Sequence, residues 1–316
     1  MKKILALLAA AVLALCLCGT AAAEGTTYTI GICQLVQHVA LDAATQGFQD
    51  ALKAKLGDAV TFDVQNASGD SNTCSTIVNS FVSNSVNLIM ANATPALQAA
   101  VAATGDIPIL GTSVTDYATA LELDNWSGAT GINVSGTSDL APLEQQAAML
   151  QELFPQAKSV GLLYCSAEPN SKYQADAIRD YLEEMGFGCT DFTFADSNDV
   201  ASVAQNACDA SDVLYIPTDN TAASCTEAIR NVVEPARIPV IAGEEGICRG
   251  CGVATLSISY YDLGYATGEM AYEILVNGAD IATLPVRFAP NVTREYNAEL
   301  CGLLGITVPE GYVAIQ

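Results

Sequence analysis

The sequence predicts an α/β fold of two doubly wound, Rossmann-like lobes that are joined by a hinge. Short apolar runs typical of buried parallel strands alternate with helical patterns, and several of these runs end in small polar loops. The succession occurs twice: residues 107–111 (IPILG) correspond to residues 238–243 (IPVIAG), an offset of 131 residues (238 minus 107). Open α/β sheets bind ligands at the carboxyl ends of their strands, so we expect a ligand in the cleft between the lobes.

The first copy of the repeat predicts one complete lobe. Apolar residues Ala44, Phe48 and Leu52 recur at helical spacing, and Thr94-Pro95 has the form of an N-cap followed by proline at the first helical position. The expected strands are residues 28–33, 61–65, 88–91 and 107–110, and the expected helices are residues 41–56, 73–83 and 95–103. Residues 118–138, interrupted by glycines, form a segment that crosses to the other lobe, with a short strand at 129–134.

The second copy repeats this plan. The expected strands are residues 159–164, 190–194, 213–216, 238–242 and 253–257, and the expected helices are residues 142–154, 172–185, 199–208, 221–233 and 263–277, with a loop at 243–252. We expect the first lobe to comprise residues 26–138 and 256–285, and the second lobe residues 139–255 and 286–316. Several crossings between two lobes form a hinge that permits closure.

Composition restricts the classes of function. The 316 residues suffice for two lobes, each with its own core, and 51% apolar with 15% charged residues exclude a disordered chain. The formal net charge of −23 argues against nucleic acid and anionic membrane surfaces as partners. We therefore expect a monomer that binds a small molecule.

Residues 1–23 have the features of a secretory signal peptide. Two lysines precede an apolar run, and three alanines then offer a cleavage site (Lys2 and Lys3, residues 4–18, Ala21 to Ala23). We therefore expect an exported protein, periplasmic or extracellular. Cys16 or Cys18 offers lipid anchoring to the membrane as an alternative, although the leucine before each favours simple cleavage.

Nine cysteines remain after such cleavage, an odd number scattered through predicted strands and helices. This distribution indicates buried free thiols rather than a disulfide framework. Only Cys248 and Cys251 have C-x-x-C spacing, which leaves a local disulfide, or a zinc or redox role, as alternatives.

Five segments, in order along the chain, resemble one family of proteins. They are residues 34–41 (QLVQHVAL), 93–96 (ATPA), 112–116 (TSVTD), 215–221 (YIPTDNT) and 259–264 (SYYDLG). The chain is similar over residues 28–312 to ABC-transporter substrate-binding proteins of the tryptophan/tyrosine type, which have a type I periplasmic-binding-protein fold. This resemblance implies capture of an amino acid, often aromatic, outside the cell and delivery to a membrane permease.

Other classes of function remain as alternatives. A ligand-binding sensory protein that serves a membrane receptor is the second reading, and a cleft enzyme is a remote third. The sequence contains no phosphate-binding loop, no nucleophile elbow and no metal-ligand cluster, so we expect no enzymatic activity, no metal and no cofactor.

A zwitterionic amino acid needs donors for its carboxylate and acceptors for its ammonium group. Helix N-termini supply the donors, and polar residues at strand ends supply the rest. The expected ligand contacts are Gln34, His38, Thr94, Pro95, Thr115, Asp116, Ser166, Asn170, Ser171, Thr218, Asp219, Asn220, Glu245 and Tyr260. For Thr94 and Ser171, a plain capping role is the alternative.

Asp219 is the expected partner of the ammonium group. It follows a predicted strand, in a loop without a nearby lysine or arginine to pair with it. Its alternative role is to cap the helix that follows. Tyr260 or Tyr261 is expected to form a wall of the pocket.

Overall fold

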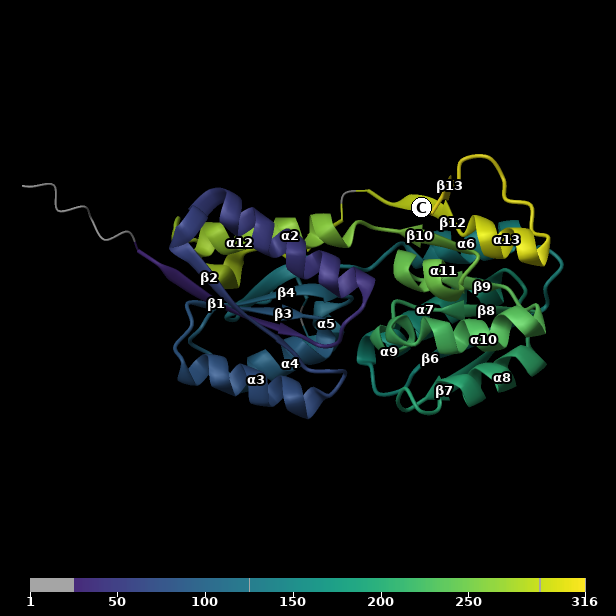
Figure 1. The fold of residues 1–316 in the computed structure, drawn as a ribbon, viewed down its shortest axis with the longest axis horizontal. Helices are drawn as coiled ribbons and strands as arrows, with labels where there is room; N and C mark the ends of the chain where they lie inside the picture. Colours follow the sequence, from purple (N-terminus) through teal and green to yellow (C-terminus); the bar gives the residue numbers. More distant parts are fainter. Residues whose placement is uncertain (1–25, 125, 290, 316) are drawn as a thin grey trace, which may run out of the picture.

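The computed structural model describes residues 26–124, 126–289 and 291–315. The expected signal peptide, with Cys16 and Cys18, lies outside the described residues. Within them, no helix combines the length and the apolar character that a membrane crossing requires. Two lobes of similar construction lie side by side along the long axis of the molecule (Figure 1).

The first lobe is built on a parallel sheet with the strand order β11-β5-β4-β3-β1-β2. Its strands are β1 Tyr28–Gln34, β2 Val60–Asn66, β3 Leu88–Asn92, β4 Ile109–Val114, β5 Val134–Ser138 and β11 Arg287–Phe288. Its helices are α2 Val39–Leu56, α3 Ser71–Ser83, α4 Thr94–Ala103, α5 Tyr117–Leu121 and α12 Tyr260–Leu275, with short 3-10 turns η1 Gly57–Ala59 and η2 Ile281–Thr283.

Alternating side chains along the central strands bury both faces of this sheet. Ile30 and Met90 pack with α2 and α12 on one face, and Cys33 and Ile89 pack with α3 and α4 on the other. Figure 1 shows these two helix pairs on opposite sides of the strands. The loops at the carboxyl ends of the strands are therefore where such a sheet presents polar groups to a ligand.

The second lobe has the strand order β13-β12-β10-β9-β8-β6-β7, in which β12 runs antiparallel to β10. Its strands are β6 Ser159–Cys165, β7 Gly188–Phe194, β8 Val213–Ile216, β9 Val240–Ala242, β10 Ala254–Ser257, β12 Thr293–Tyr296 and β13 Val313–Ala314. Its helices are α6 Leu143–Leu153, α7 Pro169–Glu184, α8 Val200–Ala210, α9 Asn220–Ser224, α10 Thr226–Ala236, α11 Glu245–Cys251 and α13 Ala298–Leu304. Helices α6, α7 and α13 cover one face of the sheet, and α8 to α11 cover the other.

The chain crosses between the lobes after β5, after β10 and after β11. Strand β10 pairs with β9 and β12 in the second sheet, although the expected boundary fell at residue 255. Strand β11 pairs with β5 in the first sheet, although the expected boundary fell at residue 285. Because both strands are hydrogen-bonded into their sheets, the crossings lie two to three residues closer to the C-terminus than expected (257 minus 255, 288 minus 285).

Several sequence-based element bounds were wrong. The strand expected at 129–134 is β5, Val134–Ser138, and the helix expected at 221–233 is divided at Cys225, whose backbone (φ −119°, ψ 20°) leaves the helical region. The loop expected at 243–252 contains α11. Helix α11 is too short to show a hydrophobic period, and its start is defined by the Glu244 side chain, which accepts hydrogen bonds from the backbone N–H groups of Gly246 and Ile247.

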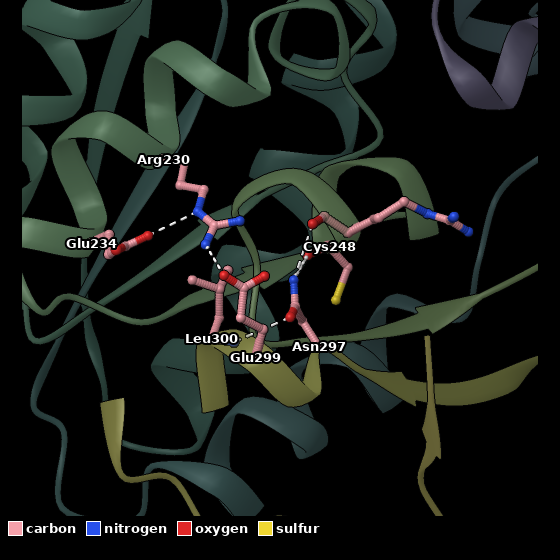
Figure 2. Close-up of polar contacts among 7 residues, drawn as sticks. Arg230, Glu234, Cys248, Asn297, Glu299 and Leu300 are labelled. Atoms are coloured by element: carbon pink, nitrogen blue, oxygen red, sulfur yellow. Dashed lines mark hydrogen bonds and ion pairs between the residues drawn. The ribbon is translucent and has the colours of Figure 1, made fainter. Parts of the chain in front are cut away.

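Figure 2 shows how the C-terminal segment is attached to the second lobe. Arg230 on α10 donates to Glu234 (2.8 Å) and to Glu299 on α13 (2.6 Å). Asn297 donates to the carbonyl oxygens of Cys248 (3.2 Å) and of the residue that follows it, and its Oδ1 caps α13. One amide side chain therefore joins the carboxyl end of α11 to the amino end of α13.

All nine cysteines in the described part of the chain are free thiols. Cys248 and Cys251 are both buried on α11, and the Cys251 thiol donates to the carbonyl oxygen of Ile247 (3.4 Å) rather than pairing with a second sulfur. The described residues also contain no group of three or more His, Cys, Asp and Glu side chains that could hold a metal ion.

Candidate functional site

The carboxyl ends of the strands in each lobe face the other lobe. His38 precedes α2 in the first lobe, and its Nε2 lies 3.3 Å from Oδ1 of Asn220 in the second lobe. The Nδ2 group of Asn220 donates to Glu168 (2.6 Å), which determines the orientation of the amide and leaves its oxygen to accept from the imidazole. This contact joins the two lobes at one side of the site.

A continuous set of buried polar contacts, here called the polar ring, joins the lobes at a second place. Gln174 on α7 donates to Thr115 Oγ1 across the lobe interface (3.4 Å) and to the carbonyl oxygen of Thr218 (3.1 Å). Tyr260 donates to Asp139 Oδ2 (2.9 Å). The side chains of Thr218 and Thr115 lie close enough to favour the ionised forms of Tyr260 and Asp139, respectively, and these five residues make up the polar ring. No member of the ring is more than 9% exposed.

The backbone that presents the first lobe's loops is strained. Ala93 has φ 92° and ψ 159°, a conformation that is essentially restricted to glycine, and it immediately precedes the start of α4. Ser113 has φ 54°, and the register between β4 and β5 shifts between Gly111 and Val114. Such irregularities change the direction of side chains and occur at binding sites, where the surrounding structure compensates for the free energy of the strained backbone.

Several buried polar atoms around the polar ring have no hydrogen-bond partner among the described residues. The hydroxyl oxygens of Thr94 and Ser113 belong to the first lobe, and the amide oxygen of Asn170 belongs to the second. Asp139 Oδ1 and His38 Nδ1 are also unpartnered. Buried polar atoms are nearly always paired, because an unpaired one costs about 1–3 kcal/mol. This cluster therefore indicates a ligand that has both donors and acceptors.

Three cavities lie at the lobe interface, and their linings include His38, Pro95 and Tyr260. One of about 210 Å³ lies between Leu35 and Pro95 in the first lobe and Glu168 and Asn220 in the second. Another, of about 220 Å³, is lined by His38 and by the α10–α11 region. The third, of about 230 Å³, lies at the hinge and is lined by residues that include Val39, Glu244 and Tyr260.

Burial dominates the electrostatics of the site. It raises the pKa of Asp139 above its ordinary value, against the hydrogen bonds from Tyr260 and Thr115. It also raises the pKa of Glu244 to about 7, and it lowers the pKa of His38, which favours the neutral imidazole. A neutral His38 that donates from Nε2 carries a bare Nδ1 able to accept a hydrogen bond.

The structure brings part of the expected site together. Thr115, Thr218 and Tyr260 are members of the polar ring, and Asn170 lies one helical turn before Gln174 and donates to the Thr218 carbonyl oxygen (3.2 Å). His38 and Asn220 form the second contact between the lobes, and Thr94 and Pro95 begin α4. Contact of these residues with a ligand stays a prediction.

Other expected contacts are engaged elsewhere. Gln34 bonds Thr45 and Asp42 within the first lobe, and the Asp116 side chain caps α5. The exposed Ser166 donates to the carbonyl oxygen of Phe194, and Glu245 forms an ion pair with Arg249 on its own helix. These side chains serve local structure.

Asp219 acts as a helix cap, which is the alternative that the sequence left open. Its Oδ1 accepts from the backbone N–H of Ala222 (2.7 Å), and its Oδ2 accepts from the backbone N–H of Cys165 (2.7 Å). The buried Ser171 hydroxyl also bonds this carboxylate. Since both oxygens are engaged within the second lobe, these contacts argue against Asp219 as the ammonium partner.

Sequence reasoning missed Asp139, Glu168 and Gln174. Asp139 directly follows β5, but the expected end of that strand was several residues too early. Glu168 directly precedes Pro169, the first residue of α7, and so stands at the N-cap position that a proline-led helix indicates. Gln174 lies four residues after Asn170, which places both on one face of α7.

Two α/β lobes that enclose a buried polar site between their strand ends define a binding protein for a small solute. Residues 29–315 match the family described as ABC transporter substrate binding protein, and the chain belongs to this family. The expected two-lobed fold and the expected class of protein are thereby confirmed. The family is one of binding proteins, not enzymes.

Individual relatives are similar over most of their length. A tyrosine-binding protein of Clostridioides difficile (strain R20291) is 39% identical over 260 residues, which cover 81% of this chain and 75% of that protein. The solved structure of an ABC domain from Streptococcus pneumonia in complex with L-Trp is 32% identical, with a TM-score of 0.86, 92% of this chain covered and 100% of that one. The ligand-free, open structure of a substrate-binding protein with adhesive properties from Clostridium difficile is 37% identical, with a TM-score of 0.69, 92% of this chain covered and 99% of that one.

The two solved structures differ in how well they superpose on this chain. The open, ligand-free relative has the higher sequence identity but the lower TM-score. In this chain the two lobes are in contact, through Gln174 with Thr115 and through His38 with Asn220.

Proposed function

We propose that this protein captures an aromatic amino acid, tyrosine or tryptophan, between its lobes and delivers it to the permease of an ABC transporter. The family supplies the transporter and an extracytoplasmic site of action. The similarity to a tyrosine-binding protein and to an L-Trp complex supports the aromatic side chain. The observation that carries the proposal is the cluster of buried, unpartnered polar atoms between the lobes.

The unpartnered atoms match the two ends of a zwitterion. The hydroxyl groups of Thr94 and Ser113 donate to the carboxylate, and the N-terminus of α4 adds free backbone N–H groups and the positive end of its dipole. The oxygens of Asp139 and Asn170 accept from the ammonium group. Donors come from the first lobe, whereas Asn170 belongs to the second, so the ligand holds the lobes together.

The cavity beside Pro95 is the place for the aromatic side chain. It adjoins the start of α4, and its lining includes the apolar side chains of Leu35, Val36 and Ala167 as well as the hydroxyl of Thr221. The lining also contains polar side chains, among them Asp70, Glu168 and Asp196. Apolar contacts beside hydrogen-bonding groups can accommodate a phenol or an indole, each of which has an apolar body and one polar atom.

A thermal-shift screen of the twenty amino acids tests the proposal. We expect L-tyrosine or L-tryptophan to raise the melting temperature in proportion to the logarithm of its concentration above Kd. Thr94→Val keeps the side-chain shape but removes a carboxylate donor, and it should weaken binding by about tenfold, which corresponds to about 1.4 kcal/mol. Thr76→Val, on the exposed face of α3, is the matched control. Stabilisation by a sugar or a metal ion, and by no amino acid, would show that the assignment is wrong.

A further inference from the structure

Asp139 lies in the hinge itself. It follows β5, the last strand before the chain enters the second lobe at α6, and its side chain bonds Tyr260, the first residue of α12 after another crossing. The Asp139–Tyr260 hydrogen bond therefore ties two of the crossing segments to each other. A charge that binds here acts directly on the part of the molecule that moves when the lobes close.

The surroundings of Asp139 provide hydroxyl groups, and no Lys, Arg or His in the described part of the chain forms an ion pair with it. Tyr260 from α12 donates to it, and Thr115 from the β4–α5 loop lies beside it. The negative charge of an ionised Asp139 would raise the pKa values of Tyr117 on α5 and of Glu244 at the start of α11. The side chain is 2% exposed, and its Oδ1 has no partner among the described residues. An ionised carboxylate in such a place needs a compensating positive charge.

We propose that Asp139 is the cation receptor of the site, and that a ligand's primary ammonium group replaces a proton on this hinge carboxylate. The inference rests on the proposed function and extends it to the exchange of charge. In the ligand-free protein the protonated acid is favoured, because the buried Oδ1 has no partner among the described residues and burial raises the pKa of Asp139. When the ammonium group binds, the O–H bond of the acid breaks, the proton passes to the solvent, and the carboxylate accepts an N–H from the ligand.

This exchange has two measurable consequences. Binding releases up to one proton per ligand, and affinity rises with pH through the titration range of Asp139, because the protonated acid competes with the ammonium group. The exchange also makes the amine essential: 3-(4-hydroxyphenyl)propanoic acid, which is tyrosine without its amine, leaves the carboxylate uncompensated.

Isothermal titration calorimetry with L-tyrosine tests the inference. Titrations at each pH in two buffers that both buffer there but differ in ionisation enthalpy, repeated from about pH 5 to about pH 7, where the ligand's own groups keep their charge, give the number of protons released. We expect release in the wild-type protein that decreases as the pH rises, and binding of the amine-free analogue that is at least about tenfold weaker, a difference of about 1.4 kcal/mol. Asp139→Asn should bind tyrosine without proton release and should discriminate less against the analogue.

Glu244→Gln is the control, since it removes the other buried carboxylate near Tyr260 and should retain proton release. Binding of tyrosine by the wild-type protein without proton release, or equal affinity for the analogue, would overturn the inference and leave the proposed function standing. Binding of no aromatic amino acid at all would overturn the proposed function, and the inference with it. The analogue experiment needs only the wild-type protein, so the test does not depend on the folding of the variants.

Discussion

Asp139 and Asp219 are both nearly inaccessible carboxylates at the lobe interface, and their hydrogen bonds assign them different roles. Asp219 accepts two backbone N–H groups and the Ser171 hydroxyl, whereas Asp139 keeps one oxygen unpartnered. Burial and the neighbouring Glu168 raise the pKa of Asp219 to about 8, although its N–H partners oppose this shift. We therefore propose a structural role for Asp219 and ligand binding for Asp139.

Substitution Asp219→Asn tests this assignment. Asparagine presents an amide N–H₂ group to a backbone N–H, so one of the two bonds to Ala222 and Cys165 is lost and a buried donor is left unpaired. We expect the free energy of unfolding to fall by about 1–3 kcal/mol, while the affinity of the folded protein for L-tyrosine stays within about twofold. Urea denaturation and calorimetry measure the two quantities. A large loss of affinity with unchanged stability would restore Asp219 as the ammonium partner.

The local sequence could identify Asp219 as a candidate but could not assign its role. The absence of a nearby lysine or arginine was visible, whereas the N–H of Cys165, 54 residues away along the chain, enters only through the fold. Asp139, in contrast, was not identified as a candidate from the sequence. Its position after a strand was hidden by the glycines of the crossing segment, which shifted the expected strand.

At the scale of elements, helices α2 and α12 are in unusually close contact through small residues. A Cβ atom on Gly264 would lie 1.9 Å from the carbonyl oxygen of Ala44, and one on Gly47 would lie 2.1 Å from that of Tyr261. The backbones therefore approach more closely than any larger side chain would allow. This packing joins α12, which follows a crossing and begins with Tyr260, to the first lobe.

Gly264→Ala should separate the two helices. We expect it to lower the free energy of unfolding by at least about 1–3 kcal/mol, because the clash is with backbone and no side chain can move away. Gly302→Ala on α13 is the matched control: nothing lies within 4 Å of its added Cβ, so the better helix propensity of alanine should stabilise the protein by up to about 1 kcal/mol. Equal melting temperatures for the two variants would contradict the close packing.

The elements differed in how far the sequence could predict them. Strands such as β8, which is buried along its whole length, are continuous apolar runs, and the expected residues 213–216 are those observed. Helix α11 depends on a cap from Glu244 and on the Asn297 amide from the distant C-terminal segment, so no local period marks it. Tertiary contacts decide such short elements.

At the scale of the whole molecule, the internal repeat predicted two lobes, but their relative placement depends on contacts that no local pattern contains. The bonds of Gln174 to Thr115 and of His38 to Asn220 join residues 59 and 182 positions apart. The crossing segments after β5, β10 and β11 also connect the lobes. We propose that the ligand shifts an open arrangement toward a closed one that keeps the contacts between the lobes, which requires a higher affinity for the closed state.

Small-angle X-ray scattering with and without L-tyrosine tests this account most directly, with binding confirmed by calorimetry in the same sample. A shift from 1% to 99% closed requires about 5.5 kcal/mol of preference, which a few charge-assisted hydrogen bonds to the second lobe can provide. The account predicts a smaller radius of gyration in the bound protein, and Asn170→Ala, which removes a second-lobe acceptor, should reduce the change at equal saturation. An identical radius with and without bound tyrosine would contradict closure of the lobes over the ligand.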